Sequence, residues 1–316
     1  MSFHPDMRMA RHAVQTVLVT GLGGFVGGHL QAALAGRQDW RLLPAPAHDL
    51  LDRASLDAWL AQGVPDAVIH LAGQTFVPES FRDPQHTLNV NLLGTLNLLQ
   101  ALKSAGFCGS FLFVSSGDVY GQVEEADLPI RETLVPRPRN PYAVSKVAAE
   151  LLCQQWSYVE PWRIMVARPF NHIGAGQAEG FVIPSMARQL VRVRRGLQAP
   201  QLEVGDVDVT RDFLDVGDVI EAYLALLEHG QNGAIYNVCS GVERRVRDLI
   251  LQMADLAGVQ VELVQDAVRL RRAEQRRVVG CAEKLQEATG WQPALSITET
   301  LQRVLADWEA REPEHV

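Results

Sequence analysis

The sequence predicts a doubly wound α/β fold, with a parallel sheet and a smaller C-terminal lobe interleaved with the sheet domain. Short apolar runs alternate with helical patterns over roughly the first 170 residues, which is typical of βαβ units. A glycine-rich turn, TGLGGFVG, joins the first apolar run to the first helical pattern. After Asn171 the alternation gives way to segments interrupted by Gly and Pro. A chain of 316 residues is also long enough for two lobes that share one cleft.

The elements of the first domain follow from the period of their apolar residues. Short apolar runs such as QTVLVT and FLFVS indicate buried strands, and apolar residues three and four apart indicate helices. We therefore predict strands over 15–20, 40–43, 66–71, 111–115 and 163–167, and helices over 25–35, 87–102 and 142–156.

The second lobe is predicted to interrupt the first domain. A basic helix is expected over 185–195 and a strand over 201–204, but 215–227 and 234–238 resemble a further helix and strand of the first domain. We therefore expect a dinucleotide-binding domain over 14–171 plus about 212–239, and a substrate-binding lobe over about 172–211 plus 240–309. The last helix, around Leu301, has one apolar face that indicates packing.

Composition excludes several classes of function. With 47% hydrophobic and 21% charged residues the chain is typical of globular proteins, and a net charge of -8 argues against nucleic acid as the main partner. No apolar run approaches the roughly 20 residues that span a bilayer, and residues 1–13 lack a signal-peptide core. We expect a cytoplasmic enzyme without a membrane role. The 4 cysteines show no metal-binding spacing, so we predict reduced core thiols and no metal site.

The glycine-rich turn favours dinucleotide binding. Gly21, Gly24 and Gly27 permit a tight turn, and a pyrophosphate can meet backbone N–H groups at the positive end of the following helix. A plain glycine-rich turn is the alternative, but the strand before it and the helix after it favour a cofactor. The second strand ends in LLPAPAH, and an acid arrives only at Asp49. Without an acid for the ribose hydroxyl, NADP(H) is favoured, with NAD(H) as the alternative.

Three polar residues suggest acid–base chemistry. Tyr142 and Lys146 stand four apart on a predicted helix and so share one face. A tyrosine has a pKa of about 10, which a neighbouring ammonium lowers, so we expect Lys146 to make Tyr142 a usable acid or base. Ser116 closes the run FLFVSS at the carboxyl edge of the sheet. It can hydrogen-bond a substrate carbonyl, although capping the following turn is the alternative.

Other polar residues are weaker candidates. His70 is predicted to be a packed strand histidine, because no carboxylate partner is evident nearby. Ala72 and Gly73, which follow it, are small enough to let a cofactor approach. In the second lobe, guanidinium groups suit a diphosphate and a carboxylate suits ribose hydroxyls, although solvated surface charge is the simpler interpretation of each alone. These residues are Arg211, Arg271, Arg272 and Glu274.

Together the motifs resemble the extended short-chain dehydrogenases/reductases that act on nucleotide sugars, from about Gln15 to Trp308. The matching segments are TGLGGFVG, DLLD, HLAG, NLLGT, SSGDVYG, NPYAVSK, RPFNHIGAGQ and RDFLDVGDV. The resemblance implies a Rossmann domain, a GDP-sugar substrate and a homodimer formed through the Asn91 and Tyr142 helices. It also implies that Ser116, Tyr142 and Lys146 form the catalytic set.

The resemblance further implies two sets of binding residues. Asp49 and Leu50 would approach adenine, and the second lobe would hold the substrate diphosphate and nucleoside. The cofactor contacts implied are Gly21, Gly24, Phe25, Val26, Gly27, Asp49, Leu50, Leu71, Ala72, Gly73, Tyr142, Lys146 and Pro169. The substrate contacts implied are Gln74, Ser116, Gly117, Tyr142, Asn171, Arg211, Arg271 and Glu274.

Reduction of a 4-keto sugar is the favoured reaction. A 4,6-dehydratase needs an acid and a base after the catalytic hydroxyl, whereas Gly117 has no side chain and Asp118 reaches one methylene less than Glu. A 4-epimerase would use the same three residues but keep its nicotinamide bound. A non-catalytic dinucleotide sensor would be expected to lose the Tyr/Lys pair. The stereochemistry of the product at C4 stays open.

Overall fold

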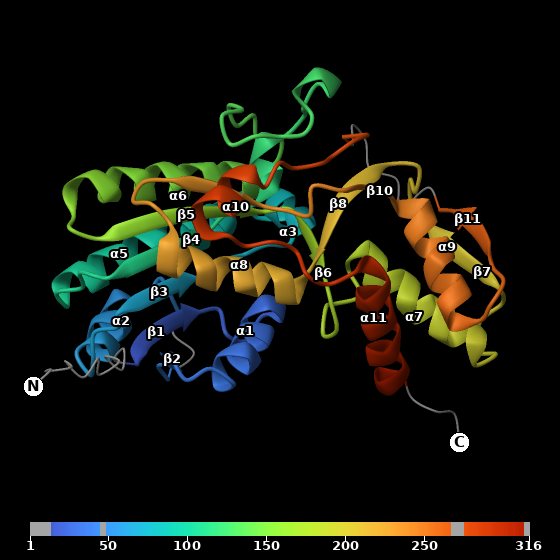
Figure 1. The fold of residues 1–316 in the computed structure, drawn as a ribbon, viewed down its shortest axis with the longest axis horizontal. Coiled ribbons are helices and arrows are strands. Elements are labelled where there is room, and N and C mark those ends of the chain that lie inside the picture. Colours follow the sequence, from blue (N-terminus) through green and yellow to red (C-terminus); the bar gives the residue numbers. More distant parts are fainter. Residues whose placement is uncertain (1–13, 45–48, 267–274, 313–316) are drawn as a thin grey trace, which may run out of the picture.

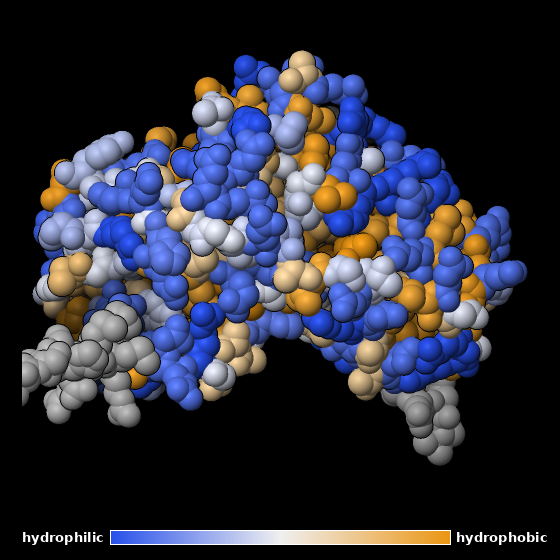
Figure 2. All heavy atoms as spheres, in the orientation of Figure 1, coloured by the Kyte–Doolittle hydropathy of each residue, from blue (hydrophilic) through white to orange (hydrophobic). Residues whose placement is uncertain are grey.

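The protein is described by a computed structural model that covers residues 14–44, 49–266 and 275–312. Figure 1 shows two lobes side by side, a larger one built on a sheet and a smaller one that carries the C-terminal helix. The face seen in Figure 2 is mostly hydrophilic over the larger lobe and is indented between the two lobes. No helix in the described part of the chain is both long and apolar enough to cross a membrane.

The larger lobe is built on a parallel sheet of six strands in the order β2-β1-β3-β4-β5-β9. Its strands are β1 (Gln15–Thr20), β2 (Trp40–Leu42), β3 (Ala67–His70), β4 (Ser110–Val114), β5 (Arg163–Pro169) and β9 (Ile235–Val238). Because β2 and β3 flank β1 on opposite sides, the direction of winding reverses there. Such a reversal opens a crevice at the carboxyl ends of the strands. The predicted doubly wound fold is confirmed.

Helices cover both faces of this sheet. Side chains alternate along a strand, so Val17 and Val19 enter one core and Leu18 enters the other. The first face is covered by α1 (Phe25–Ala35), α8 (Val216–His229) and α10 (Glu283–Thr289). The second face is covered by α2 (Arg53–Leu60), α5 (Gly94–Ser104) and α6 (Pro141–Val159).

The helix predicted over 87–102 is built from three consecutive segments. They are α4 (Pro84–Leu88), a π-helical turn (Asn89–Leu93) and α5. Asp83 caps α4 by accepting a hydrogen bond from the His86 N–H, directly after the short helix α3 (Val77–Arg82). The π-helical turn carries Asn91, whose side chain faces α6.

The smaller lobe has its own core, in which Leu190, Met253 and Leu301 meet. Its helices are α7 (Val182–Arg194), α9 (Val246–Ala257) and α11 (Ile297–Arg311), which begins at a capping box formed by Ser296 and Glu299. Its strands are β6 (Asn171–Ile173), β8 (Thr210–Asp215) and β10 (Glu243–Arg245) in one sheet, and β7 (Gln201–Val204) with β11 (Glu262–Gln265) in another. Between β8 and β10 the chain returns to the larger lobe to form α8 and β9.

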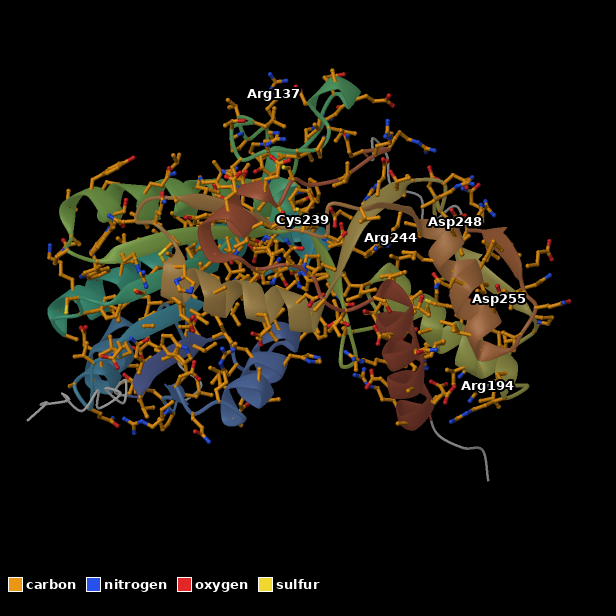
Figure 3. The ribbon with its side chains drawn as sticks, in the orientation of Figure 1. Arg137, Arg194, Cys239, Arg244, Asp248 and Asp255 are labelled. Carbon is orange, nitrogen blue, oxygen red and sulfur yellow. The ribbon has the colours of Figure 1, made fainter. Side chains whose placement is uncertain are left out.

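Three of the four cysteines are buried free thiols, and Figure 3 labels one of them, Cys239, inside the larger lobe. The fourth, Cys108, is exposed, which contradicts its predicted core location. It lies in the short connection between α5 and β4, where the chain runs along the surface.

Candidate active site

The glycine-rich turn lies at the crevice between β1 and β3. Gly21 has a φ of 81°, and a Cβ atom there would lie 2.8 Å from the Ala72 backbone nitrogen. A Cβ atom on Gly27 would lie 2.3 Å from the carbonyl oxygen of Gly21. Only glycine tolerates such close backbone approach, so the motif holds the ends of β1 and β3 against the start of α1.

The first turn of α1 is suited to a pyrophosphate. The N-cap residue is Gly24, which has no side chain to accept hydrogen bonds from the first N–H groups of the helix. The first turn, which the structure describes in full, also contains no acidic residue. The N–H groups of Phe25, Val26 and Gly27 therefore remain available at the positive end of the helix dipole. These residues fit the diphosphate of a dinucleotide cofactor.

The residues proposed near adenine differ in what they can offer. The Asp49 carboxylate accepts a hydrogen bond from the Leu51 N–H at 2.9 Å, so it stabilises its own turn. The Leu50 side chain is buried, and its Cβ would lie 2.9 Å from a Cβ atom on Gly94. Leu50 is therefore a core side chain, and a contact from it to adenine would come from its backbone.

Tyr142 and Ser116 are brought together, although they come from different elements. Ser116 follows β4, accepts a hydrogen bond from the Asp118 N–H at 3.1 Å, and also hydrogen-bonds Tyr142. The capping role predicted for Ser116 is therefore present, and its side chain also lies beside Tyr142. Tyr142 is the second residue of α6, whose N-cap Asn140 accepts a hydrogen bond from the Ala143 N–H at 2.7 Å.

Lys146 lies one turn further along α6 and is almost fully buried. Its Nζ donates a hydrogen bond to the Val114 carbonyl at 2.9 Å and lies 6.0 Å from the centre of the Tyr142 ring. Gly73 leaves room for it, because a Cβ atom there would lie 3.5 Å from Nζ and 2.9 Å from Asn91 Oδ1. The small residue after β3 is therefore necessary for this packing.

The pKa of Tyr142 corrects one sequence-based prediction. Burial raises the pKa of Tyr142 to about 12; the hydrogen bond with Ser116 opposes the rise and Asp118 adds to it. The prediction that Lys146 lowers this pKa is wrong for this structure, because Nζ is directed to the sheet carbonyl of Val114. Burial also lowers the pKa of Lys146 to about 8, against the opposing charge of Glu150. Tyr142 is thus a neutral proton donor around neutral pH.

Two neighbouring groups, His70 and Asp118, already have hydrogen-bond partners within the chain. His70 is buried, and its ring nitrogens bond the Thr20 hydroxyl at 2.7 Å and the Thr95 hydroxyl at 2.9 Å. Burial, with a smaller effect of Lys146, lowers its pKa to about 3, which confirms a packed neutral histidine. The Asp118 carboxylate accepts a hydrogen bond at 2.7 Å from the side chain of Asn140, so it is tied to the start of the Tyr142 helix.

Of the proposed substrate residues that the structure describes, Gln74 follows β3, Gly117 follows β4 and Asn171 follows β5. Gln74 is held by Asn91, whose Oδ1 accepts from the Gln74 N–H at 2.7 Å. A Cβ atom on Gly117 would lie 3.2 Å from the Phe170 ring. Asn171 is exposed and pairs in register with Phe213, so Asn171 and Arg211 share one face of neighbouring strands. Arg271 and Glu274 lie outside the described residues, as does Arg272.

Sequence reasoning missed the role of Asn91 inside the site. Asn91 is buried in the π-helical turn, and its Nδ2 donates to the Gln74 carbonyl at 2.9 Å and to the Ser145 hydroxyl at 2.8 Å. It therefore joins the loop after β3 to the face of α6 that carries Tyr142 and Lys146. The signal was present in the segment NLLGT, but the resemblance assigned the Asn91 helix only to the dimer interface.

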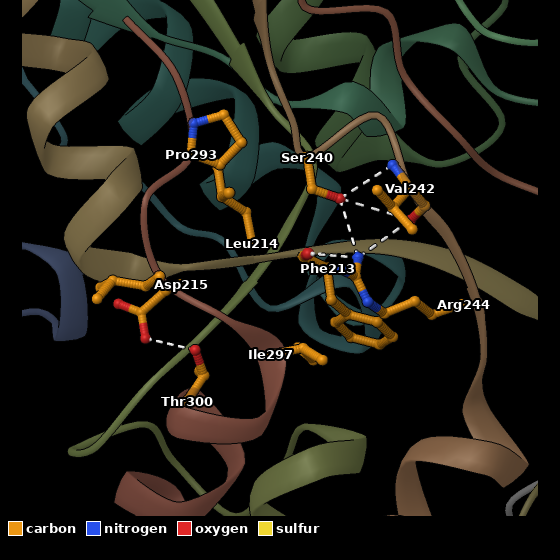
Figure 4. A pocket seen from close by; sticks show the side chains of 10 residues that line it. Phe213, Leu214, Asp215, Ser240, Val242, Arg244, Pro293, Ile297 and Thr300 are labelled. Atoms are coloured by element: carbon orange, nitrogen blue, oxygen red, sulfur yellow. Dashed lines mark hydrogen bonds between the residues drawn. The ribbon is translucent and has the colours of Figure 1, made fainter.

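A separate pocket of about 200 Å³ lies against β8 (Figure 4). Ser116, Tyr142 and Lys146 do not line it. Its polar groups already have partners within the chain: Asp215 accepts from the Thr300 hydroxyl at 2.7 Å, and Arg244 donates to the Phe213 carbonyl at 3.3 Å. The lining residues are Phe213, Leu214, Asp215, Ser240, Val242, Arg244, Pro293, Leu295, Ile297 and Thr300.

The fold and the site define a dinucleotide-dependent enzyme with a Ser/Tyr/Lys set, and comparison with known proteins narrows this class. The family model described as GDP-mannose 4,6 dehydratase matches residues 43–304, so the chain belongs to this family. The GDP-6-deoxy-D-mannose reductase of Pseudomonas aeruginosa is 63% identical over 94% of this chain and 98% of that protein. The GDP-6-deoxy-D-talose 4-dehydrogenase of Aggregatibacter actinomycetemcomitans is 29% identical over 87% of this chain and 91% of that protein.

Solved structures agree with this placement. The structure of RMD from Pseudomonas aeruginosa complexed with NADPH has a TM-score of 0.91 and 62% identity, and covers 94% of this chain and 100% of that one. The UDP-glucose 4-epimerase of Thermus thermophilus, in complex with NAD, has a TM-score of 0.80 and 30% identity, and covers 93% of this chain and 98% of that one.

Proposed function

We propose that the protein reduces the 4-keto group of GDP-4-keto-6-deoxy-D-mannose to give GDP-D-rhamnose, with NADPH as the hydride donor. The observation that carries this proposal is the buried, neutral Tyr142 hydrogen-bonded to Ser116. A neutral phenol donates a proton, as reduction of a ketone requires. The relative that is 63% identical is named as a reductase of this kind, and its solved counterpart contains NADPH.

The chain's own residues would assist reduction in three ways. NADPH, when bound, supplies the hydride for C4 of the sugar. Tyr142 protonates the C4 oxygen as negative charge develops there, and Ser116 hydrogen-bonds the same oxygen. Lys146 orients the ribose of the cofactor, and the first turn of α1 binds the pyrophosphate.

Elimination and epimerisation are the alternatives, and the site favours neither. The Asp118 carboxylate, the side chain nearest in sequence for proton removal at C5, is bonded to Asn140. An epimerase would re-oxidise its own cofactor and would therefore consume no NADPH. Net consumption of NADPH separates reduction from both alternatives.

The proposal is tested with GDP-4-keto-6-deoxy-D-mannose prepared beforehand by a separate dehydratase. Purified protein, substrate and NADPH are mixed, nicotinamide absorbance is followed, and the product is identified by NMR. We expect one NADPH oxidised per substrate and a single product with the rhamnose configuration. A talose product would overturn the assigned stereochemistry, and absence of oxidation would overturn the reductase. NADH in parallel tests the cofactor preference.

We also propose that the smaller lobe binds the nucleotide part of the substrate. Its boundaries would be about 172–211 plus 240–309, except that all of β8 lies in the sheet of this lobe and α10 packs in the core of the larger lobe. Asn171 and Arg211, on one face of adjacent strands, would hold the diphosphate, and Arg271 and Glu274 would hold the nucleoside. The other lobe, 14–171 plus about 212–239, would bind NADP(H).

A homodimer formed through α6 is proposed on the basis of an exposed apolar stripe. Val144, Leu151 and Tyr158 are seven residues apart on α6, so they share one face, and the side chains of Leu151 and Tyr158 are 61% and 81% exposed.

A cytoplasmic location is proposed because the buried free thiols suit a reducing compartment.

Leu151→Glu should convert this dimer into a monomer, because it places a charge in the apolar interface. Sedimentation velocity at micromolar concentration measures the change. Leu251→Glu is the matched control, since Leu251 is an exposed leucine on α9, away from this face. A wild-type monomer, or a Leu151→Glu dimer, would exclude this interface.

The pH dependence of reduction should follow Lys146. The pKa of Lys146 is about 8 and that of Tyr142 about 12, so raising the pH removes the Lys146 proton first. We expect kcat/KM to be constant below pH 7 and to fall about tenfold per pH unit well above pH 8. A profile measured from pH 6 to pH 10 that stays level to pH 10 would disprove this assignment.

A further inference from the structure

A buried ion pair lies directly beyond Lys146 on the same face of α6. Glu150 follows Lys146 by four residues, and both of its carboxylate oxygens accept hydrogen bonds from Arg168 of β5, at 2.9 Å from Nε and 2.6 Å from Nη2. Glu150 and Arg168 are each 2% exposed. The Arg168 guanidinium also lies 4.8 Å from the centre of the Tyr120 ring. The carboxylate is thus held in one orientation by a two-pronged contact.

The need for this pair is not explained by stability. Two charges lose their hydration when they are buried, and apolar residues of similar volume often replace such a pair without loss. Neither Glu150 nor Arg168 takes part in the proposed proton transfer. Their position next to Lys146 offers another explanation.

Among the residues that the structure describes, Glu150 is the carboxylate that acts on the Lys146 ammonium. Lys146 makes no ion pair with any described residue, and its Nζ contacts a carbonyl and lies over the Phe113 ring at 5.0 Å. The titratable groups around it are His70 on β3 and Tyr142, Glu150 and Cys153 on α6. His70 is neutral, and burial raises the pKa of both Tyr142 and Cys153, so these two stay protonated. Arg168 is bonded to the Glu150 carboxylate and is the further charged group next to it.

We infer that Glu150, held in place by Arg168, is a positioning residue that supplies the counter-charge for the Lys146 ammonium. A buried ammonium is costly without a compensating anion, because it has left water for a medium of low dielectric constant. Glu150 compensates that charge from one helical turn further along α6. Arg168 prevents the carboxylate from turning away, because it holds both carboxylate oxygens.

Glu150→Gln tests this inference because the amide keeps the size of the side chain and one acceptor for Arg168 but removes the charge. The first readout is kcat/KM against pH for the proposed reduction. This readout rests on the proposed function. The second is the NADPH dissociation constant against pH, measured by fluorescence without substrate. We expect the alkaline limb of both profiles to move at least one pH unit lower, with activity roughly tenfold below wild type at pH 9 and nearly unchanged at pH 6.

Two further variants complete the test. The double variant Glu150→Gln with Arg168→Gln removes the unpaired arginine charge that could disturb folding, and it should move the limb in the same direction by a smaller amount. Glu160→Gln, at the C-cap of α6 and paired with Lys103, should keep the wild-type limb. An equal loss at every pH, or a wild-type limb in the double variant, would show a purely structural pair. If no turnover occurs with the proposed substrate, the NADPH profiles still decide the role of Glu150.

Discussion

Tyr142→Phe should lower kcat by about 10²–10⁴-fold and leave NADPH affinity close to wild type. The substitution removes the hydroxyl that protonates the sugar oxygen, and general acid catalysis contributes about this much. The ring remains, so the packing of α6 against the end of β4 should be preserved. Initial rates of NADPH oxidation measure the first effect, and quenching of protein fluorescence by NADPH measures the second.

Tyr158→Phe is the matched control for this substitution. Tyr158 lies on the same helix but is exposed, and the same hydroxyl removed there should leave the rate unchanged. A Tyr142→Phe protein with wild-type turnover would exclude Tyr142 as the acid. Loss of NADPH binding together with turnover would show that the phenol acts mainly in cofactor binding.

Asp212→Ala should destabilise the protein by about 3–5 kcal/mol, the largest stability effect that we expect. Asp212 is fully buried on β8, and its carboxylate accepts hydrogen bonds from the N–H groups of Ser240, Gly241 and Gly280 at 2.8, 3.0 and 3.1 Å. Alanine would leave these three donors without their partner inside the protein. The free energy of unfolding in urea measures the change.

Asp208→Ala provides the comparison, because Asp208 lies in the same lobe but pairs with Arg245 and Arg247 at the surface. Exposed pairs contribute little to stability, so this variant should unfold close to wild type. If both variants unfolded at the same urea concentration, the buried carboxylate would not be the anchor that its hydrogen bonds indicate.

Regular elements with a strong apolar period were predictable from the sequence. The strands over 15–20 and 201–204 and the helix over 25–35 have the predicted bounds. Apolar residues at a regular spacing define such elements locally, and partners far along the chain only confirm them. The turn between the first strand and helix was predictable for the same reason, because its glycines lie within seven residues.

Elements that depend on distant partners were not predicted. The segment Glu243–Arg245 is charged and resembles a loop, yet it forms β10 because it pairs with β8 and places Arg244 opposite Arg211. Likewise, Thr210–Asp215 was not predicted to be a strand, and most of it appeared only within the matching segment RDFLDVGDV. A strand of this kind gains its stability from hydrogen bonds to a neighbour, which a local pattern does not contain.

By itself, the sequence predicted the doubly wound fold, the glycine-rich turn and the candidate residues Ser116, Tyr142 and Lys146. Apolar periods, clustered glycines and the Tyr/Lys spacing are local patterns, and Ser116 ends a recognisable apolar run. The tertiary structure decided the electrostatics of that set. A separation of four residues along a helix places Lys146 and Tyr142 on one face. Burial keeps the phenol neutral, and the position of β4 beside α6 lets the ammonium donate to the Val114 carbonyl. The Glu150–Arg168 pair, which joins a helix to a strand, also exists only in the folded protein. Charge and burial act through space between distant segments, so only the folded chain sets them.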